Sequence, residues 1–404
     1  MSERVVITGL GVISSIGIGW EQFWNNLLKG QSGISPVASF DTSNQFTHMA
    51  GEVKIFKPEN FMRQELLGTL SRSSQMALAG AKLALNDAHI LSSDASTINI
   101  ATCIGTNIGS IQTVEKVNEI LLRGNNIDIS DRLVAQIPTE TTPAMIAKEF
   151  NLDGGNMIFS TACSAGNYAV GYGFDLIKLD RAQAVLAGGF DAFSKVAFTG
   201  FNQFAAVAPD KCRPFDKNRK GMMVAEGAGM LVLEALESAL QRKALIYAEV
   251  LGYGLSCDAH HMTSSSVDGI KLCMRKALKE AGVSSENIDY ISAHGTGTLT
   301  NDKNECAAIK EVFGRRCNKI PASSIKSMLG HTMGAASAIE AITCALVVKN
   351  DMIPPTINYE TPDSECDIDC VPNQSRKHSV TIALNNSYAF GGNNACLVLS
   401  KFIN

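Results

Sequence analysis

The chain lacks an apolar run of membrane-spanning length, and its net charge of −4 over 404 residues provides no excess of basic side chains for nucleic acid. The paired cysteines and histidines of a zinc site are also missing, because only Cys366 and Cys370 lie close together among 11 scattered cysteines. An odd, scattered set suits a reducing compartment better than a disulfide framework. The N-terminal "MSERVVITGLG" has no signal-peptide pattern. We therefore expect a cytoplasmic protein with no bound metal and no membrane or nucleic-acid partner.

Strand-like and helix-like segments alternate along the whole chain, which is 45% hydrophobic and 18% charged. This alternation predicts an α/β fold with largely parallel sheets covered by helices. A length of 404 residues exceeds one simple core, so we expect two halves, 1–245 and 246–404, that share a fused core. The expected strands are 4–10, 98–106, 156–161, 182–189, 246–254, 288–294, 319–325 and a terminal hairpin over 379–400; the expected helices are 73–90, 144–150, 164–180, 269–282, 301–313 and 333–350.

The expected helix 164–180 has apolar or very small residues on every side, which predicts that it is buried on every side. Its glycines, Gly166, Gly171 and Gly173, weaken an isolated helix. We therefore expect neighbouring elements to pack closely against them.

Cys163 stands where the strand "NMIFST" meets this helix. Most cysteines in such a chain are buried structural residues. A cysteine at a helix N-terminus, however, lies where backbone N–H groups and the helix dipole favour the thiolate. Small neighbours such as Ala162, Ser164 and Gly166 leave room for a substrate carbonyl and a backbone oxyanion hole. Cys163 is therefore a candidate nucleophile that needs partners.

Three further motifs supply candidate partners. "AHGTGTLTND" places His294 at the end of a strand, with Thr296 and Thr298 following among glycines. "SSIKSMLGHTMGAASAIE" places Lys326 and His331 between a strand and a helix. A buried lysine there needs a partner, and Glu340 lies along the following helix. "NNSYAFGGNNA" places Phe390 beside two glycines in the expected hairpin turn.

Read in order, "TACSAG", "AHGTGT", "KSMLGH" and "AFGGNN" resemble the β-ketoacyl-[acyl-carrier-protein] synthases of the elongating synthase II type. The resemblance runs from "RVVITGLGVISSIG" to "FGGNNACLVLS" and covers essentially the whole chain. It implies the thiolase fold, with two pseudo-duplicated α/β halves in a five-layer αβαβα arrangement, and a dimer. The first half, 1–245, then carries the nucleophilic cysteine, and the second half, 246–404, carries both histidines and the lysine.

The resemblance also implies a role for each matching residue. Cys163 accepts the acyl chain, and its backbone N–H forms the oxyanion hole with that of Phe390, whose ring is the gate. The remaining matches are His294 and His331 as the two active-site histidines, Lys326 held by Glu340, Thr296 and Thr298 at the phosphopantetheine arm, and Ile108 at the acyl pocket.

The implied reaction is a decarboxylative Claisen condensation of an acyl chain with malonyl-acyl-carrier-protein, giving a 3-oxoacyl-carrier-protein in fatty-acid or type II polyketide elongation. Acyl transfer requires a thiolate and therefore a lowered thiol pKa. Decarboxylation leaves an enolate, which two neutral histidines stabilise by donating N–H groups. No resident cofactor is expected, since the 4'-phosphopantetheine arrives on the acyl carrier protein.

Other members of the wider fold fit the motifs less well. A thiolase has a second cysteine where this chain has His331, and a priming synthase has an asparagine in place of the second histidine. A cysteine hydrolase makes no use of the histidine pair. A non-catalytic, chain-length-factor-like subunit lacks the nucleophile that Cys163 supplies. The alternative that stays open is a ketosynthase subunit that pairs with a chain-length-factor partner in a specialised polyketide or polyene pathway.

The expected surface for carrier docking departs from the family pattern. The segments Met62–Ser74 and Asn125–Asp131 lack the usual basic clusters, and Ala205 stands where an arginine is common. Acidic carriers are normally attracted by basic patches. We expect either apolar docking through residues such as Leu66, Leu67 and Leu70, or a second subunit that supplies the charges.

Overall fold

The structure, a computed structural model, describes residues 3–91, 98–124 and 129–403. Within this part of the chain, the central sheet has 11 strands: two five-strand groups joined where β1 pairs with β9 at Val5–Ile7, and the two-residue strand β2 (Gly17–Ile18), which pairs with β1. The first group, in spatial order, is β6 (Asn156–Phe159), β5 (Ile100–Gly105), β7 (Ala184–Asp191), β8 (Gly227–Ala235) and β1 (Val5–Ser14). The second is β11 (Ala322–Ser323), β10 (Tyr290–Ser292), β14 (Ile382–Tyr388), β15 (Asn393–Ser400) and β9 (Ala248–Cys257).

The two groups repeat the same topology. Numbered along the chain within each group, the strands lie in the order 3-2-4-5-1 in both. In both, the first two pairings are parallel and the last two are antiparallel. The expectation of largely parallel sheets is therefore wrong for half of each group. Antiparallel strands that are buried on both faces, such as β8, show the same continuous apolar runs as parallel ones.

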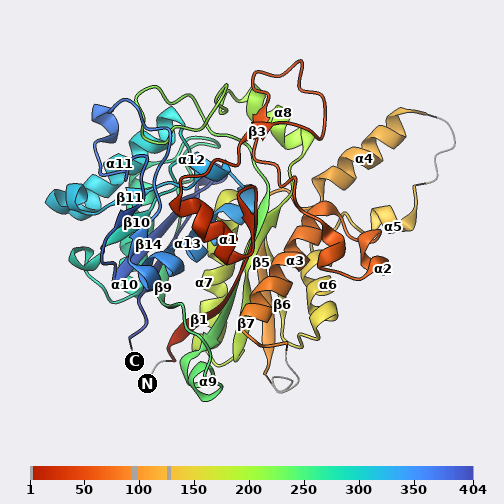
Figure 1. Cartoon of the computed structure of the whole chain (residues 1–404), viewed down its shortest axis with the longest axis horizontal. Helices are drawn as coiled ribbons and strands as arrows, with labels where there is room; N and C mark the ends of the chain where they lie inside the picture. Colours follow the sequence, from red (N-terminus) through yellow and green to blue (C-terminus); the bar gives the residue numbers. More distant parts are fainter. Residues whose placement is uncertain (1–2, 92–97, 125–128, 404) are drawn as a thin grey trace.

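Helices divide the described chain into five layers (Figure 1). The central layer holds α7 (Ala165–Lys178) and α13 (Ala336–Asn350), which pack on each other and contact strands of both groups. The outer faces are covered by α3 (Arg72–Asp87) and α6 (Thr141–Phe150) on the first group and by α10 (Val267–Glu280) and α11 (Leu299–Phe313) on the second. Amphipathic helices outside and uniformly apolar helices between the sheets follow from this arrangement.

The central helices approach each other as closely as their glycines predict. A Cβ atom on Gly166 of α7 would lie 2.7 Å from the backbone nitrogen of Ala338 on α13. The segment Met333–Asn350 is long and apolar enough to cross a membrane, but 89% of it is buried inside the molecule. It is therefore a core helix of this fold.

The remaining elements complete the fold around these layers. The terminal hairpin is confirmed, since β14 and β15 pair antiparallel around a turn at Phe390–Gly392. The expected helix 301–313 begins two residues earlier, at Leu299, with Thr298 as its N-cap. The other helices are α1 (Trp20–Leu28), α2 (Gln64–Leu67), α4 (Ile111–Leu122), α5 (Asp131–Val134), α8 (Lys195–Gln203), α9 (Leu236–Gln241) and α12 (Lys326–Leu329); the short strands are β2 (Gly17–Ile18), β3 (Ser35–Pro36), β4 (Met49–Ala50), β12 (Met352–Ile353) and β13 (Arg376–Lys377).

Candidate active site

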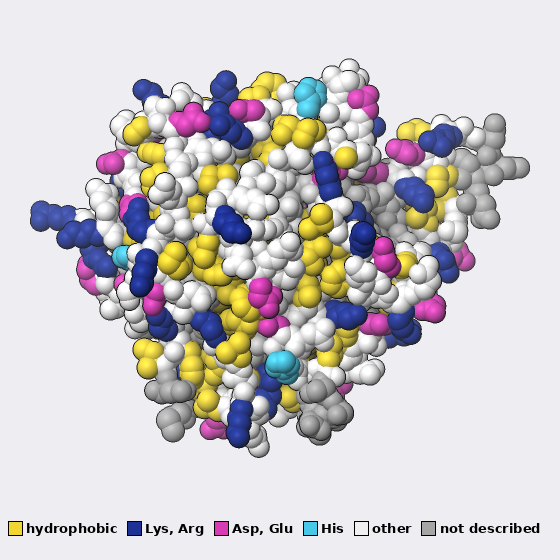
Figure 2. Space-filling model, viewed as in Figure 1, with side chains coloured by type: hydrophobic (Ala, Val, Ile, Leu, Met, Phe, Trp, Pro, Cys, Tyr) yellow, Lys and Arg dark blue, Asp and Glu magenta, His cyan; other side chains and the backbone are white. Residues whose placement is uncertain are grey.

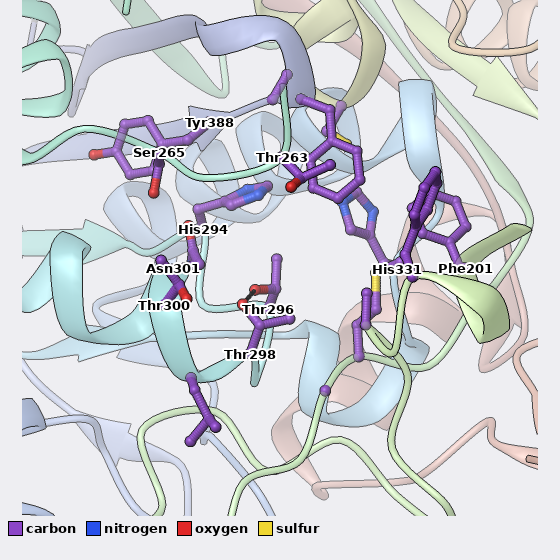
Figure 3. Close-up of a pocket in the computed structure, with 18 of the residues that line it drawn as sticks. Phe201, Thr263, Ser265, His294, Thr296, Thr298, Thr300, Asn301, His331 and Tyr388 are labelled. Atoms are coloured by element: carbon purple, nitrogen blue, oxygen red, sulfur yellow. Dashed lines mark hydrogen bonds between the residues drawn. The ribbon is translucent and has the colours of Figure 1, made fainter. Parts of the chain in front are cut away.

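A cavity of about 330 Å³ lies where turns of the two halves meet, and it brings most of the predicted site residues together. Figure 3 shows His294 and His331 on neighbouring sides of this cavity, with Thr296 and Thr298 close by. The predicted residues that line it are Cys163, His294, Thr296, Thr298, His331 and Phe390. The other predicted residues, Ile108, Lys326 and Glu340, are not in its lining.

Cys163 lies in a tight turn between β6 and α7. Ala162, directly before it, has a φ of 52°, which is uncommon for a residue with a side chain. One 3₁₀ turn, Ala162–Ser164, then leads into α7. The terminal hairpin fixes this turn, because Ser387 Oγ donates to the Cys163 carbonyl at 3.1 Å and Ser164 Oγ donates to the Asn393 carbonyl at 3.0 Å. The nucleophile candidate is therefore held against the hairpin that carries Phe390.

The second half contains a turn of the same form. Met333 also has a φ of 52° and begins a 3₁₀ turn, Met333–Ala335, that leads into α13. His331 precedes this turn, and Cys163 occupies the matching turn of the first half. Because α7 and α13 pack side by side, both turns open at the same end of the central layer.

Two backbone N–H groups point at the Cys163 sulfur, its own and that of Phe390. They favour the thiolate, as does the Lys326 ammonium, but burial is the larger influence and raises the pKa of Cys163 to about 12. The expected lowering of the thiol pKa is therefore wrong for the substrate-free site, because burial of Cys163 disfavours the charged thiolate. The same two N–H groups are placed to bind an oxyanion that forms on a carbonyl attached to this sulfur.

His331 follows α12 and presents one fixed ring nitrogen. Its Nδ1 accepts a hydrogen bond from the Met333 N–H at 3.1 Å, and its own backbone N–H donates to the Met223 carbonyl at 2.7 Å. Burial and the Lys326 ammonium hold the pKa of His331 well below its usual range. A neutral ring whose Nδ1 accepts must carry its proton on Nε2. His331 therefore offers an Nε2–H donor.

His294, on another side of the cavity, also has its Nδ1 facing a hydrogen-bond donor. Its Nδ1 lies 3.5 Å from Lys326 Nζ, and Lys326 is also bound to Glu340 in a buried ion pair. Burial, followed by the Lys326 ammonium and His331, holds the pKa of His294 well below its usual range. The two imidazole rings meet edge to face, with centroids 5.5 Å apart. The cavity thus contains two neutral histidines whose Nε2 atoms carry the protons.

Glu305, which the sequence reasoning missed, fixes the loop that carries His294. Its two carboxylate oxygens accept the N–H groups of His294 and Gly295, each at 2.8 Å. Burial raises the pKa of Glu305 to about 7, against the effect of these two N–H donors. The signal that could have found it is an acidic residue on the same face of the expected helix 301–313 as the apolar Cys306 and Ile309, both of which are buried.

Asp191, also missed, ties the two halves together beside Cys163. Its carboxylate accepts the Thr106 hydroxyl at 2.6 Å and the N–H groups of Ile108 at 3.1 Å and Gly334 at 2.7 Å. Burial raises its pKa to about 6. An acidic residue at the end of the apolar strand β7 was the available signal. Ile108 is thus held near the site through its backbone, although its side chain does not line the cavity.

Phe390 lies at the cavity with other aromatic residues around it. Its ring centroid is 5.9 Å from that of Phe201 at the end of α8 and 6.4 Å from that of Phe204. Gly391 and Gly392 each have a φ of 79°, so the turn depends on glycine. Thr296 and Thr298 also line the cavity and share a hydrogen bond of 2.9 Å between their hydroxyls (Figure 3).

Family models match both halves of the chain. Residues 2–239 match the model described as the N-terminal domain of β-ketoacyl synthase, and residues 247–360 match that of the C-terminal domain. The chain belongs to the β-ketoacyl synthase family. A curated relative from Synechocystis sp., "3-oxoacyl-[acyl-carrier-protein] synthase 2", is 38% identical over 99% of this chain and 98% of its own, and one from Staphylococcus aureus is 37% identical over 99% of both.

Solved structures of ketosynthases share the fold of this β-ketoacyl synthase. The "ishigamide ketosynthase/chain length factor" superposes with a TM-score of 0.96 at 44% identity, covering 100% of both chains. A type II polyketide synthase acyl-carrier protein in complex with its hexaketide-bound ketosynthase gives 0.92 at 33% identity, again over 100% of both. The thiolase fold predicted from the motifs is thereby confirmed, together with the five layers described above.

The docking residues expected for this synthase are placed differently from the prediction. Leu66 and Leu70 are only 7% and 5% exposed and belong to the core, so apolar docking through these two residues is wrong. Leu67, the third residue of that prediction, is partly buried against the same core, and docking through it stays a prediction. Arg63 and Arg72 already pair with Glu149 and Glu226, at 2.7 and 2.6 Å. Residues 125–128 of the second expected docking segment lie outside the described residues.

Proposed function

We propose that this synthase joins an acyl chain carried on Cys163 to the malonyl group of malonyl-acyl-carrier-protein, with loss of CO₂. The observation that carries the proposal is one cavity that holds a buried thiol beneath two backbone N–H groups and two neutral histidine donors. The two halves, 1–245 and 246–404, contribute the thiol and the histidines respectively. Each group fits a different step of the reaction.

The first step is acyl transfer from the carrier to the enzyme. The Cys163 sulfur forms a bond to the thioester carbonyl carbon, the bond from that carbon to the pantetheine sulfur breaks, and the thiol proton ends on the departing sulfur. The oxyanion formed during this exchange accepts the N–H groups of Cys163 and Phe390. Because burial raises the pKa of Cys163 to about 12, the thiol stays protonated until a substrate arrives.

The second step is decarboxylation of the malonyl group. The bond to the carboxylate breaks, CO₂ leaves, and the electron pair moves onto the thioester as an enolate. The Nε2–H groups of His294 and His331 donate to the enolate oxygen. Neutral donors serve this step because neither has to lose or gain a proton while charge develops.

The third step forms the carbon–carbon bond. The enolate carbon attacks the acyl carbonyl on Cys163, whose oxyanion again occupies the two N–H groups, and the bond from carbon to the Cys163 sulfur breaks. The released Cys163 thiolate takes one proton from solvent. The overall reaction therefore consumes one proton for each malonyl carboxylate that leaves as CO₂. The product leaves as a 3-oxoacyl chain on the carrier.

The pantetheine arm of the carrier enters along the wall formed by Thr296 and Thr298, whose hydroxyls face the cavity. We assign Phe390 as the gate at this entrance and Ile108 to the acyl end. Lys326 and Glu340 are positioning residues that set the charge and tautomer of His294. No resident cofactor has a role in these steps, and we place the reaction in the cytoplasm.

We further propose a dimer that covers the free edge of the first half. Strand β6 ends the sheet, and Met157 on it is 39% exposed. Helix α4 projects from the body (Figure 1), with Leu122 87% exposed. Solved relatives include a ketosynthase in complex with its chain length factor. The partner is therefore a second copy of this chain or a chain-length-factor-like subunit.

The reaction is tested by incubating the enzyme, alone and with a candidate partner subunit, with acyl-carrier and ¹⁴C-carboxyl malonyl-carrier. We expect labelled CO₂ to appear in step with 3-oxoacyl-carrier, one for one. A 3-oxoacyl product without CO₂ release, or hydrolysis of the acyl-carrier as the only reaction, contradicts the proposal. Cys163→Ala is the control in which condensation is absent.

A further inference from the structure

Few basic side chains around the active-site cavity remain free to meet an anionic partner. On the face drawn in Figure 2, Lys and Arg side chains are scattered, and many lie beside Asp or Glu side chains. Lys220 differs, because it lines the active-site cavity, is exposed, and forms no hydrogen bond or ion pair with any described residue. An unpaired cation at a cavity entrance attracts anions into it.

Lys220 also lines a second cleft of about 350 Å³ that adjoins the active-site cavity. We call this the outer cleft; its other basic residues are Lys211 and Arg213. Glu360 pairs with Lys211 at 3.1 Å, and Asp210, which also lines the outer cleft, pairs with Arg213 at 3.2 Å. Arg213 Nη1 is buried and has no hydrogen-bond partner among the described residues. The outer cleft therefore has an uncompensated cation and a spare buried donor.

The backbone of Lys220 is fixed with respect to the pantetheine wall. The next residue, Gly221, donates its N–H to the Gly297 carbonyl at 2.9 Å, between Thr296 and Thr298. The preceding residue, Arg219, is buried and donates to the carbonyls of Thr298 and Leu299 at 3.3 and 3.2 Å. Only the Lys220 side chain is thus free to adjust to a ligand.

We propose that the outer cleft, through Lys220 and Arg213, binds the phosphodiester that links the pantetheine arm to its carrier protein. The inference rests on the proposed function, which brings that arm along Thr296 and Thr298. A phosphodiester is the anion that every such substrate carries at the protein end of the arm, and a lysine binds phosphate as a point charge. Lys220 therefore supplies a charge that the conventional docking segments of this chain lack.

The test compares acylation of Cys163 by acyl-pantetheine, acyl-phosphopantetheine and acyl-carrier, in the wild type, Lys220→Ala and Lys220→Glu. We expect about a fivefold loss of the acylation rate constant in Lys220→Ala with the two phosphate-bearing donors, and a larger loss in Lys220→Glu. The rate with acyl-pantetheine should change less than twofold. Lys319→Glu is the matched control, because Lys319 is exposed beyond the far end of α11.

An equal loss with all three donors, or no loss with either phosphate-bearing donor, overturns the proposal. A second measurement is independent of turnover: titration calorimetry of Cys163→Ala with pantetheine and with phosphopantetheine. Tighter binding of phosphopantetheine that disappears in Cys163→Ala/Lys220→Glu supports the outer cleft; equal binding of both contradicts it. Failure of every donor to acylate wild-type Cys163 instead overturns the proposed function, whatever the calorimetry gives.

Discussion

Lys326 Nζ lies 3.5 Å from His294 Nδ1 while it forms a buried ion pair with Glu340. The ammonium has no acceptor orbital to offer, so the His294 nitrogen that faces it must accept and the other must carry the proton. In the proposed reaction the lysine therefore acts through a neighbour: it adds to the effect of burial that keeps His294 neutral, and it leaves the proton on the ring nitrogen that does not face it.

Replacing Lys326 by Met should raise the pKa of His294, because the ammonium is one of the causes that lower it. Burial, the larger cause, remains, so the pKa should stay below 6.5. The variant also leaves Glu340 buried without its partner, which costs about 3–5 kcal/mol of folding free energy. Histidine NMR and denaturant unfolding measure the two effects. Glu340→Gln is the control that keeps Lys326 near His294, and an unchanged His294 pKa in Lys326→Met contradicts the role.

The two half-reactions should separate in variants. His294→Ala or His331→Ala should lower decarboxylation of malonyl-carrier by about 100-fold or more, since each removes an enolate donor, yet leave some acyl transfer onto Cys163. Cys163→Gln should do the reverse, because it imitates an acylated thiol. Labelled CO₂ release and acyl-enzyme formation are measured side by side. Loss of acyl transfer with decarboxylation intact in His331→Ala would reverse the roles.

Decarboxylation should tolerate mild acid. The pKa values of His294 and His331 lie well below 6.5, so both rings are still neutral donors at pH 6. Cys163→Gln should therefore release CO₂ at nearly the same rate from pH 8 down to pH 6. The stability of the fold, unlike the CO₂ rate, should depend on pH in this range. Below pH 6.5 the histidines of the unfolded chain bind protons and the buried rings of the folded chain do not, so the contribution of these two groups to stability falls as pH falls. A CO₂ rate that halves near pH 6.5 argues against neutral histidines.

The turn after Phe390 should be sensitive to a single methyl group. Gly391 has a φ of 79°, and an added Cβ meets nothing closer than 3.5 Å, so Gly391→Ala strains the backbone without a clash. The strain costs about 1–2 kcal/mol. Because the Phe390 N–H points at the Cys163 sulfur, we expect acylation to slow by about tenfold.

Gly282→Ala provides the matched control for that variant. Gly282 has a φ of 66° and open space around its Cα, but it follows α10 on the outer layer. It should lose similar stability while acylation stays unchanged. Equal effects of both variants on acylation would mean that the Phe390 turn has no special part in it.

The sequence predicted the strand-to-helix joints of this site because the chemistry there leaves short local patterns. Cys163 among small residues and His331 before a Gly- and Ala-rich helix are both visible in single motifs. The antiparallel pairings in each five-strand group were missed. Strands such as β8 are buried on both faces and therefore show no alternation of apolar and polar residues. Leu66 and Leu70 appeared available for docking, yet packing buries them, which no local pattern reveals.

The charge state of the site was equally beyond the sequence. A helix N-terminus predicts a lowered thiol pKa, but the desolvation of Cys163 outweighs both the backbone N–H groups and the Lys326 ammonium. The Asp191 carboxylate accepts the N–H of Gly334, which is distant in the chain, and the Glu305 carboxylate accepts the N–H of His294 in a loop. Such contacts form only in the folded protein, so no local sequence pattern reveals them.

The most direct test of the account is to trap the acyl-enzyme. The wild-type protein is mixed with acyl-carrier in the absence of malonyl-carrier, quenched in acid, digested and analysed by mass spectrometry. We predict one acyl group per chain, on Cys163 alone among the 11 cysteines. An acyl group on any other cysteine, or full condensation activity in Cys163→Ala, would contradict the account.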